Sequence, residues 1–417
     1  MIRTKAPAAD GARYTSGKTA GVAESPCVTL HAMKNTRRLF AFLVLAASLV
    51  TLVLAAAGPQ PAAGTHHLAL VGTYTGKTGS KGIYTYDFDS ATGKLALKGV
   101  AAETPSPSWV AIHPSGKFAY AANETGPQST ITAFSIDAKS AGLTQLNQLS
   151  ALGEDPCYLS FDKTGKYLFA ANYTSGNVVV FPILSDGKLG EHTANVKDAG
   201  TLGPNKERQE VPHAHWVQVS PDNRFVFVSD LGLDAILSYR FDAAKGTLTP
   251  NDPPAAKLAP GAGPRHVAFS PNGKNIYVVS ELNSTVTAFS YDASKGALHE
   301  LQILSTLPND FVGRNDDAEI TVHPNGKWLF ASNRGHDTVA VFAVNPTDGT
   351  LTHTGDYPTG GQEPRHFTMD PTGQYLLAEN QNSNSIAVFR IDSSTGALSQ
   401  VSFAENIPSP VCLTFLP

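Results

Sequence analysis

The chain alternates apolar and polar residues with a period of two through most of its length. Runs such as Lys117–Tyr120 and Asn275–Val279 place successive side chains on opposite faces of a strand. Apolar residues at helical spacing are absent from these alternating runs. Polar breaks of two to four residues separate the runs, so the pattern predicts short antiparallel strands joined by tight turns.

One turn-and-strand phrase occurs six times. In each copy a turn of small and polar residues leads into aromatic and β-branched residues. The turn position falls at Gly116, Gly165, Asn223, Gly273, Gly326 and Gly373. Successive copies are 49, 58, 50, 53 and 47 residues apart. A period near fifty with four strands per unit predicts the blades of a β-propeller.

The two ends of this pattern complete a seventh unit. Three strands are expected within residues 67–100, and the missing fourth strand lies at residues 409–416. We therefore predict an all-β, seven-bladed β-propeller with four antiparallel strands per blade. N- and C-terminal segments share its closing blade, and the C-terminal segment is the innermost strand. The ring would occupy residues 67–417 as one domain.

Residues 1–57 form a leader outside the ring. The segment 39–57 is uncharged and follows three basic residues, which is typical of a secretory signal. It is also long enough to remain as a membrane anchor. Met33 offers a later start that would make residues 1–32 a start-site artefact, and a Gly/Pro/Ala linker follows at 58–66.

These features predict an exported protein, periplasmic or secreted, released or anchored by residues 39–57. Residues 36–40 also fit a twin-arginine signal, so the export route stays open.

Charge and cysteine content exclude several classes of function. Beyond residue 57 the chain has 24 Lys and Arg against 33 Asp and Glu, a net charge of −9 that argues against nucleic acid as a partner. Cys27 lies in the leader. Cys157 opens the innermost strand of the second blade and Cys412 lies in that of the closing blade, with the first blade between them, so no disulfide is expected. Metal and nucleotide motifs are absent, and we expect neither a metal nor an organic cofactor.

Titratable residues converge on one mouth of the predicted channel. The entry to each innermost strand and the turn after each second strand reach this mouth. The candidates at these places are His213, His215, Arg265, His266, Glu281, Arg334, Arg365, His366 and Asn380. Arginine can hold an anion in two-point geometry or stabilise an oxyanion, and histidine or glutamate can move a proton. Ring opening of a lactone requires these three capacities.

Structural roles are alternatives for several of these residues. His266 and His366 stand in identical Pro-Arg-His phrases and could be buried partners of neighbouring strands. Glu281 could cap the turn that follows it. The inserted residues 203–211 would form either a lid over the mouth or a solvated loop. By contrast, His113 and His323 precede proline on the opposite side of the ring and are expected to stabilise turns.

Three phrases carry a family resemblance: RQEVPHAHWV at 208–217, GPRHVAFSPNGKNIYVVSELNSTVTAF at 263–289 and EITVHPNGKWLFASNRGHDTVAVF at 319–342. They resemble the lactonase family of seven-bladed propellers, which contains bacterial 6-phosphogluconolactonases and fungal carboxy-muconate lactonizing enzymes. The likeness extends from about residue 66 to the end. It implies catalytic roles for His215 (or His213), Arg265, Glu281 and Arg334, without a metal.

The expected function is hydrolysis of a sugar lactone by a monomer whose partner is a small, anionic substrate. His213, His266, Arg365, His366 and Asn380 would bind this substrate. Export separates the chain from the cytoplasmic pentose phosphate substrate, so the lactone could be a different one. The alternatives are a non-catalytic exported propeller with YVTN-type phrases, suggested by residues 168–181, and a muconate-type cycloisomerase. YVTN-type repeats run nearer forty residues, which favours the lactonase.

Overall fold

The computed structural model describes residues 65–417. The expected signal or anchor at 39–57, the alternative start at Met33, Cys27 and nearly all of the 58–66 linker lie outside the described residues. Within residues 65–417, no helix is long and apolar enough to span a bilayer. The two helices described are short 3₁₀ turns, η1 (Gly76–Thr78) and η2 (Gly126–Gln128).

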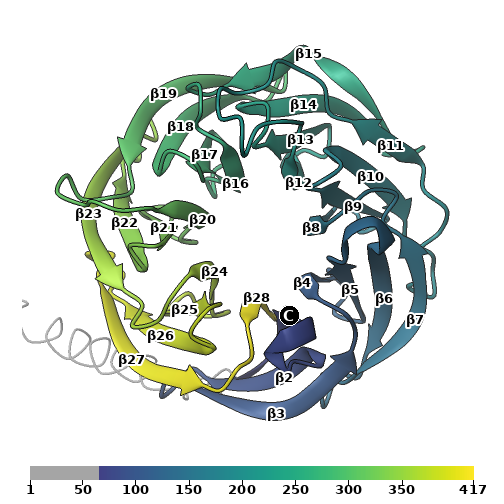
Figure 1. The fold of residues 1–417 in the computed structure, drawn as a ribbon, viewed down its shortest axis with the longest axis vertical. Helices are drawn as coiled ribbons and strands as arrows, with labels where there is room; N and C mark the ends of the chain where they lie inside the picture. Colours follow the sequence, from purple (N-terminus) through teal and green to yellow (C-terminus); the bar gives the residue numbers. More distant parts are fainter. Residues whose placement is uncertain (1–64) are drawn as a thin grey trace, which may run out of the picture. The chain divides into compact units, whose positions relative to one another are not determined.

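Seven four-stranded antiparallel sheets are arranged in a ring around a common centre, which confirms the predicted propeller (Figure 1). The closing blade contains β28 (Pro410–Phe415), β1 (His66–Thr73), β2 (Gly82–Asp89) and β3 (Lys94–Glu103). Blade 1 contains β4 (Pro107–Ile112), β5 (Phe118–Asn123), β6 (Thr130–Ile136) and β7 (Leu143–Ser150). Blade 2 contains β8 (Pro156–Phe161), β9 (Tyr167–Asn172), β10 (Asn177–Pro182) and β11 (Ala194–Lys197).

Blade 3 contains β12 (Ala214–Val219), β13 (Phe225–Asp230), β14 (Ala235–Asp242) and β15 (Thr247–Lys257). Blade 4 contains β16 (Pro264–Phe269), β17 (Asn275–Ser280), β18 (Thr285–Asp292) and β19 (Ala297–Ser305). Blade 5 contains β20 (Asp316–Val322), β21 (Trp328–Arg334), β22 (Thr338–Val344) and β23 (Leu351–Pro358). Blade 6 contains β24 (Pro364–Met369), β25 (Tyr375–Asn380), β26 (Ser385–Ile391) and β27 (Leu398–Glu405).

The first and last strands of the described residues close the ring as predicted. The C-terminal strand β28 is innermost and pairs with β1, in a register that sets Phe415 opposite Ala69 and Cys412 opposite Gly72. Pairing the last strand with the first removes two open sheet edges, so the ring is held shut by backbone hydrogen bonds.

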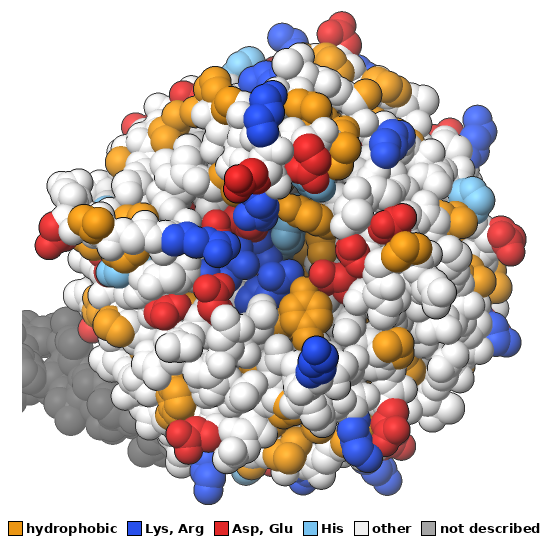
Figure 2. All heavy atoms as spheres, in the orientation of Figure 1, with side chains coloured by type: hydrophobic (Ala, Val, Ile, Leu, Met, Phe, Trp, Pro, Cys, Tyr) orange, Lys and Arg blue, Asp and Glu red, His pale blue; other side chains and the backbone are white. Residues whose placement is uncertain are grey.

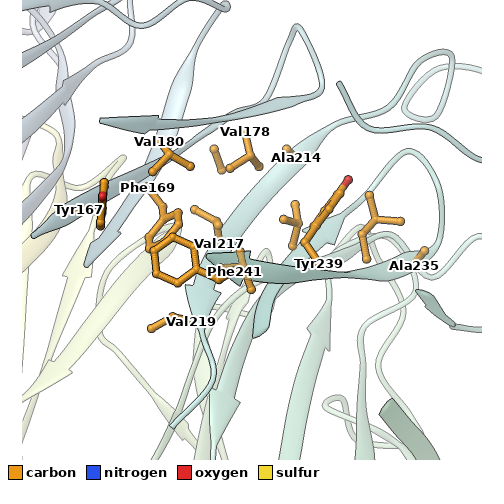
Figure 3. Packing of buried hydrophobic residues seen from close by; sticks show 14 of the residues in the cluster. Tyr167, Phe169, Val178, Val180, Ala214, Val217, Val219, Ala235, Tyr239 and Phe241 are labelled. Carbon is orange, nitrogen blue, oxygen red and sulfur yellow. The ribbon is translucent and has the colours of Figure 1, made fainter. Parts of the chain in front are cut away.

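Apolar side chains fill the space between neighbouring blades. Between blades 2 and 3, Phe169 and Val180 pack with Val217, Val219 and Phe241 (Figure 3). Strands between two such layers are apolar on both faces, and β9, β13, β17 and β25 are buried along their whole length. The outermost strands, such as β3, have exposed residues over most of their length.

The recurring turn position needs a left-handed backbone. Its φ lies between 63° and 72° in all six copies, which glycine adopts without strain and asparagine tolerates. This explains why five copies have glycine there and the sixth has Asn223. At the same end of the ring, the Nε2 atoms of His113 and His323 lie 2.9 Å from the carbonyl oxygens of Gly165 and Gly373 in the next blades. The expected turn-stabilising role is confirmed.

A β-bulge or similar irregularity near the start of the innermost strand recurs in all seven blades. In four blades, the residues of the innermost strand that still pair with the second strand on either side of the bulge are Pro156 and Tyr158 (blade 2), Ala214 and Trp216 (blade 3), Pro264 and His266 (blade 4), and Pro364 and His366 (blade 6). One residue between them has no partner on the adjacent strand. Bulges redirect a side chain relative to the sheet and are frequent beside active sites. The unpaired residues here are Cys157, His215, Arg265 and Arg365.

Candidate active site at the channel mouth

A polar pocket of about 470 Å³ lies at the mouth of the channel. Its lining residues are Glu124, Cys157, Tyr173, Arg208, His215, Glu281, Arg314, Asp316, Arg334 and Arg365. Figure 2 shows basic side chains gathered in this hollow, with acidic side chains around them. Most of the lining comes from two places in the blades: the bulge of the innermost strand and the end of the second strand.

Glu281 is the centre of a buried cluster of arginines. Its Oε2 lies 3.0 Å from Nε of Arg265 and 3.1 Å from Nη2 of Arg334, while Oε1 contacts Nη2 of Arg208. Burial alone would raise the pKa of Glu281, but the Arg334, Arg265 and Arg208 guanidiniums outweigh it and lower the pKa to about 2. Glu281 is therefore a carboxylate at neutral pH, and its side chain contacts arginines instead of capping the next turn.

Two of these arginines are fixed by the backbone of blade 5. Nη1 of Arg265 donates to the carbonyl oxygen of Ala318 at 2.6 Å. Nε of Arg334 donates to the carbonyl oxygen of Asp316 at 3.2 Å. Burial and the neighbouring Arg334 and Arg365 lower the pKa of Arg265 to about 10, so it still carries its charge at pH 7. Three cations around one carboxylate leave a positive excess that suits an anion.

Arg365 supplies a cation on another side of the pocket. Its guanidinium lies 5.4 Å from the centre of the Tyr74 ring, a cation–π contact. The Tyr74 hydroxyl donates to Glu124 at 2.8 Å. Among residues 65–417, no carboxylate oxygen lies within 4.0 Å of the Arg365 guanidinium. Arg365 can therefore receive an anionic group of a ligand.

His215 is the histidine of the pocket lining. Burial, with Arg265, His266 and Arg365 nearby, lowers its pKa well below the ordinary value. The imidazole is neutral at pH 7 and able to accept a proton. Its Nδ1 lies 3.7 Å from Sγ of Cys157. Burial raises the pKa of the Cys157 thiol, so this sulfur stays protonated and is a poor nucleophile.

The other histidine of the Pro-His-Ala-His phrase does not line the pocket. The His213 ring stacks on Tyr173, with centroids 4.4 Å apart, and its Nδ1 lies 3.0 Å from the Tyr173 carbonyl oxygen. His213 precedes β12, whereas His215 occupies the bulge. The geometry thus favours His215 where the sequence left the choice open.

His266 and His366 also lie off the lining. Nδ1 of His266 is 2.9 Å from Glu319 Oε2, and Nδ1 of His366 is 2.6 Å from Glu379 Oε2. Both rings stand edge-on to Trp109. These contacts match the alternative in which both histidines are buried partners of neighbouring strands.

The structure does not bring Asn380 to the pocket. It is fully buried at the end of β25, and its amide donates to Ser385 Oγ at 3.3 Å. The residue one position beyond the second strand reaches the mouth in other blades, as Glu124, Tyr173 and Glu281 do. A shift of one residue along a strand changes the face on which a side chain lies, which explains why the sequence misplaced Asn380.

Sequence reasoning missed the role of Arg208 in the pocket. The inserted loop 203–211 is held by Gln209, which is 1% exposed and donates to the Leu231 carbonyl oxygen at 2.9 Å and to Asp234 Oδ1 at 2.7 Å. This anchor directs Arg208 onto Glu281, so the loop covers part of the mouth as a lid would. In the sequence, the insertion was indicated by the longer spacing of 58 residues between the turn positions Gly165 and Asn223. No periodic pattern indicated which of its side chains points inward.

The fold and the pocket define a seven-bladed β-propeller with an anion-accepting, acid–base site at one mouth of its channel. Comparison with known proteins agrees with this class. The chain belongs to the lactonase family of propellers, because residues 68–415 match the family described as "Lactonase, 7-bladed beta-propeller".

The relatives include proteins named for lactone hydrolysis. A 6-phosphogluconolactonase of Bacillus subtilis (strain 168) is 37% identical over 352 residues, which cover 84% of this chain and 99% of the relative. A solved structure from Bacteroides fragilis NCTC 9343, described as a candidate 6-phosphogluconolactonase, has a TM-score of 0.79 at 38% identity and covers 86% of this chain and 100% of its own. The structure of a periplasmic gluconolactonase of Pseudomonas aeruginosa has a TM-score of 0.79 at 33% identity and covers 84% of this chain and 99% of its own.

Proposed function

We propose that this protein hydrolyses a sugar lactone, as a 6-phosphogluconolactonase does, at the channel-mouth pocket. The observation that carries the proposal is the set of arginines around Glu281 beside a neutral histidine. Buried charges are costly unless they are paired or serve a ligand. A purely structural propeller has no need of them at one mouth, which disfavours non-catalytic surface display.

His215 is the proposed general base. Its neutral imidazole takes a proton from the water that attacks the lactone carbonyl carbon, and a tetrahedral intermediate forms. Arg334, which lines the pocket, is the proposed donor to the oxyanion, and the buried Arg265, which lies outside the lining, adds positive charge. The C–O bond of the ring then breaks, and the imidazolium returns its proton to the leaving ring oxygen. This route uses side chains alone, without a metal or cofactor.

Glu281 is proposed to hold the arginines in place. Both of its oxygens contact guanidinium groups, which lower its pKa to about 2, so in this geometry it is engaged with arginines and has no oxygen directed at a water. Arg365 is proposed to anchor a carboxylate or phosphate group of the substrate, because its guanidinium faces the pocket without a carboxylate partner of its own.

The proposed location is outside the cytoplasm. The leader at 39–57 and the similarity to a periplasmic gluconolactonase support this. For that compartment, gluconolactone and other unphosphorylated sugar lactones are proposed as substrates alongside the phosphorylated one.

The experiment is a substrate panel. Purified protein is tested against 6-phosphoglucono-δ-lactone, glucono-δ-lactone, lactones that carry a carboxylate, and a muconate. The readout is the change in pH, because opening a lactone releases a proton whereas lactonising a muconate takes one up. We expect ring opening of at least one lactone well above the spontaneous rate. Turnover of the muconate alone would instead support the cycloisomerase alternative.

A further inference from the structure

Arg208 differs from the other two arginines on Glu281 in how it is held. Its side chain is 33% exposed, against 3% for Arg265 and 10% for Arg334. Arg265 and Arg334 donate to backbone carbonyl oxygens of blade 5. The guanidinium contacts of Arg208 are all with side chains: Glu281, Tyr173 at 3.3 Å, and Asp316 at 4.0 Å.

The backbone beneath Arg208 is nevertheless well anchored. Asn205 Oδ1 accepts hydrogen bonds from the amides of Glu207 at 3.1 Å and Arg208 at 3.2 Å. The neighbouring Gln209 is buried. The Arg208 side chain can therefore exchange partners within the pocket while its Cα stays in place.

We propose that Arg208 is the specificity-determining residue of this pocket: together with Arg365, which lines the same pocket, it binds the anionic group of the substrate, and it releases Glu281 Oε1 when it does so. The inference rests on the proposed lactonase function. A carboxylate or phosphate oxygen offers Arg208 the same charge-assisted contact that Glu281 gives it in this structure. The freed oxygen then accepts a hydrogen bond from a substrate hydroxyl.

The remaining charges keep Glu281 ionised after this exchange. The charged and titratable side chains around it are Arg265 on β16, Asp316 and Asp317 on β20, Arg334 on β21, Arg365 on β24, Tyr173 after β9 and Arg208 on the loop. Two fixed arginines still contact Glu281 Oε2. Departure of Arg208 therefore raises the pKa of Glu281 without neutralising it at pH 7. A lactone without an anionic group does not draw Arg208 away from Glu281. Glu281 Oε1 then stays occupied and cannot accept a hydrogen bond from a hydroxyl of that substrate.

The experiment compares Arg208→Gln with the parent in the full-length protein. Lys206→Gln is the matched control, since Lys206 is an exposed cation two residues earlier on the same loop and is not in the pocket lining. The readout is the ratio of kcat/KM for 6-phosphoglucono-δ-lactone to that for glucono-δ-lactone. We expect Arg208→Gln to lower this ratio by a factor of about 10 to 100, the usual effect of losing a hydrogen bond to a charged group. The control should preserve the ratio.

An unchanged ratio in Arg208→Gln, or equal losses for both lactones, would overturn the proposal. A binding measurement separates this outcome from failure of the lactonase function. By calorimetry, the parent and the Lys206→Gln variant should bind 6-phosphogluconate, and Arg208→Gln should bind it at least 10-fold more weakly. If no lactone is hydrolysed but this loss is seen, the lactonase function fails and the role of Arg208 in anion binding stands. If the parent does not bind 6-phosphogluconate at millimolar concentration, the role of Arg208 is refuted.

Discussion

Replacing Glu281 with glutamine should destabilise the protein measurably. The substitution keeps the size of the side chain and removes the charge that neutralises Arg265, which is 2% exposed. The pKa of Glu281 falls from the ordinary value of 4.5 to about 2. This lowering by roughly 2.5 corresponds to about 3 kcal/mol of stabilisation of the folded protein. This value agrees with the cost of breaking a buried ion pair by removing one partner, which is about 3–5 kcal/mol. A carboxylate exposed at an open mouth would change the stability little when replaced, so the expected loss depends on the burial of Glu281, which is 5% exposed.

The assay is the melting temperature as a function of pH. At pH 7 the Glu281→Gln variant should melt on the order of 5 °C below the parent. The folded pKa of Glu281 is depressed, so its contribution is present above about pH 4.5 and is lost as the pH falls toward 2. The difference between parent and variant should therefore shrink in acid. Glu207→Gln, an exposed carboxylate on the loop, is the control and should melt with the parent. A Glu281→Gln variant that melts within one degree of the parent at pH 7 would refute the reasoning.

Three further predictions concern the ring, a misplaced residue and the leader. Deleting residues 411–417 removes most of β28, which closes the ring on β1, and should abolish cooperative melting or lower its midpoint by more than 10 °C; a shift of only a degree or two would contradict that closure. Asn380→Ala should lower the melting temperature and leave kcat and KM within about twofold, because Asn380 is buried away from the pocket, so a raised KM would restore its substrate-binding role. Cell fractionation should find the protein outside the cytoplasm, and an unprocessed soluble cytoplasmic chain would exclude export.

The fold could be predicted because its determinants are periodic. Alternation identified the strands, the fifty-residue repeat identified the blades, and the unpaired strands at the two ends identified the closure by β28. Each signal depends on residues close in sequence or on a repeated phrase. Cys157 and Cys412 are free thiols, as their separation by a blade implied.

The site could be predicted only in part, since its geometry depends on departures from periodicity. Bulges turn His215 and Arg365 toward the mouth, and alternation alone gives no sign of a bulge. Asn380 was misplaced by one position along its strand. The side chain of Arg208 enters from an irregular loop, where no repeat indicates direction.

The most direct test of the account is the rate of lactone hydrolysis by the parent and by His215→Asn, measured side by side at pH 7. The parent should open a sugar lactone far faster than buffer does. The variant should lose a factor of about 10² to 10⁴ in kcat, the usual contribution of a positioned base. Because the pKa of His215 is lowered, the parent should also keep its activity below pH 6.5, where an ordinary histidine would become protonated. A parent rate equal to that of buffer for every lactone, or a His215→Asn variant with unchanged kcat, would contradict the account.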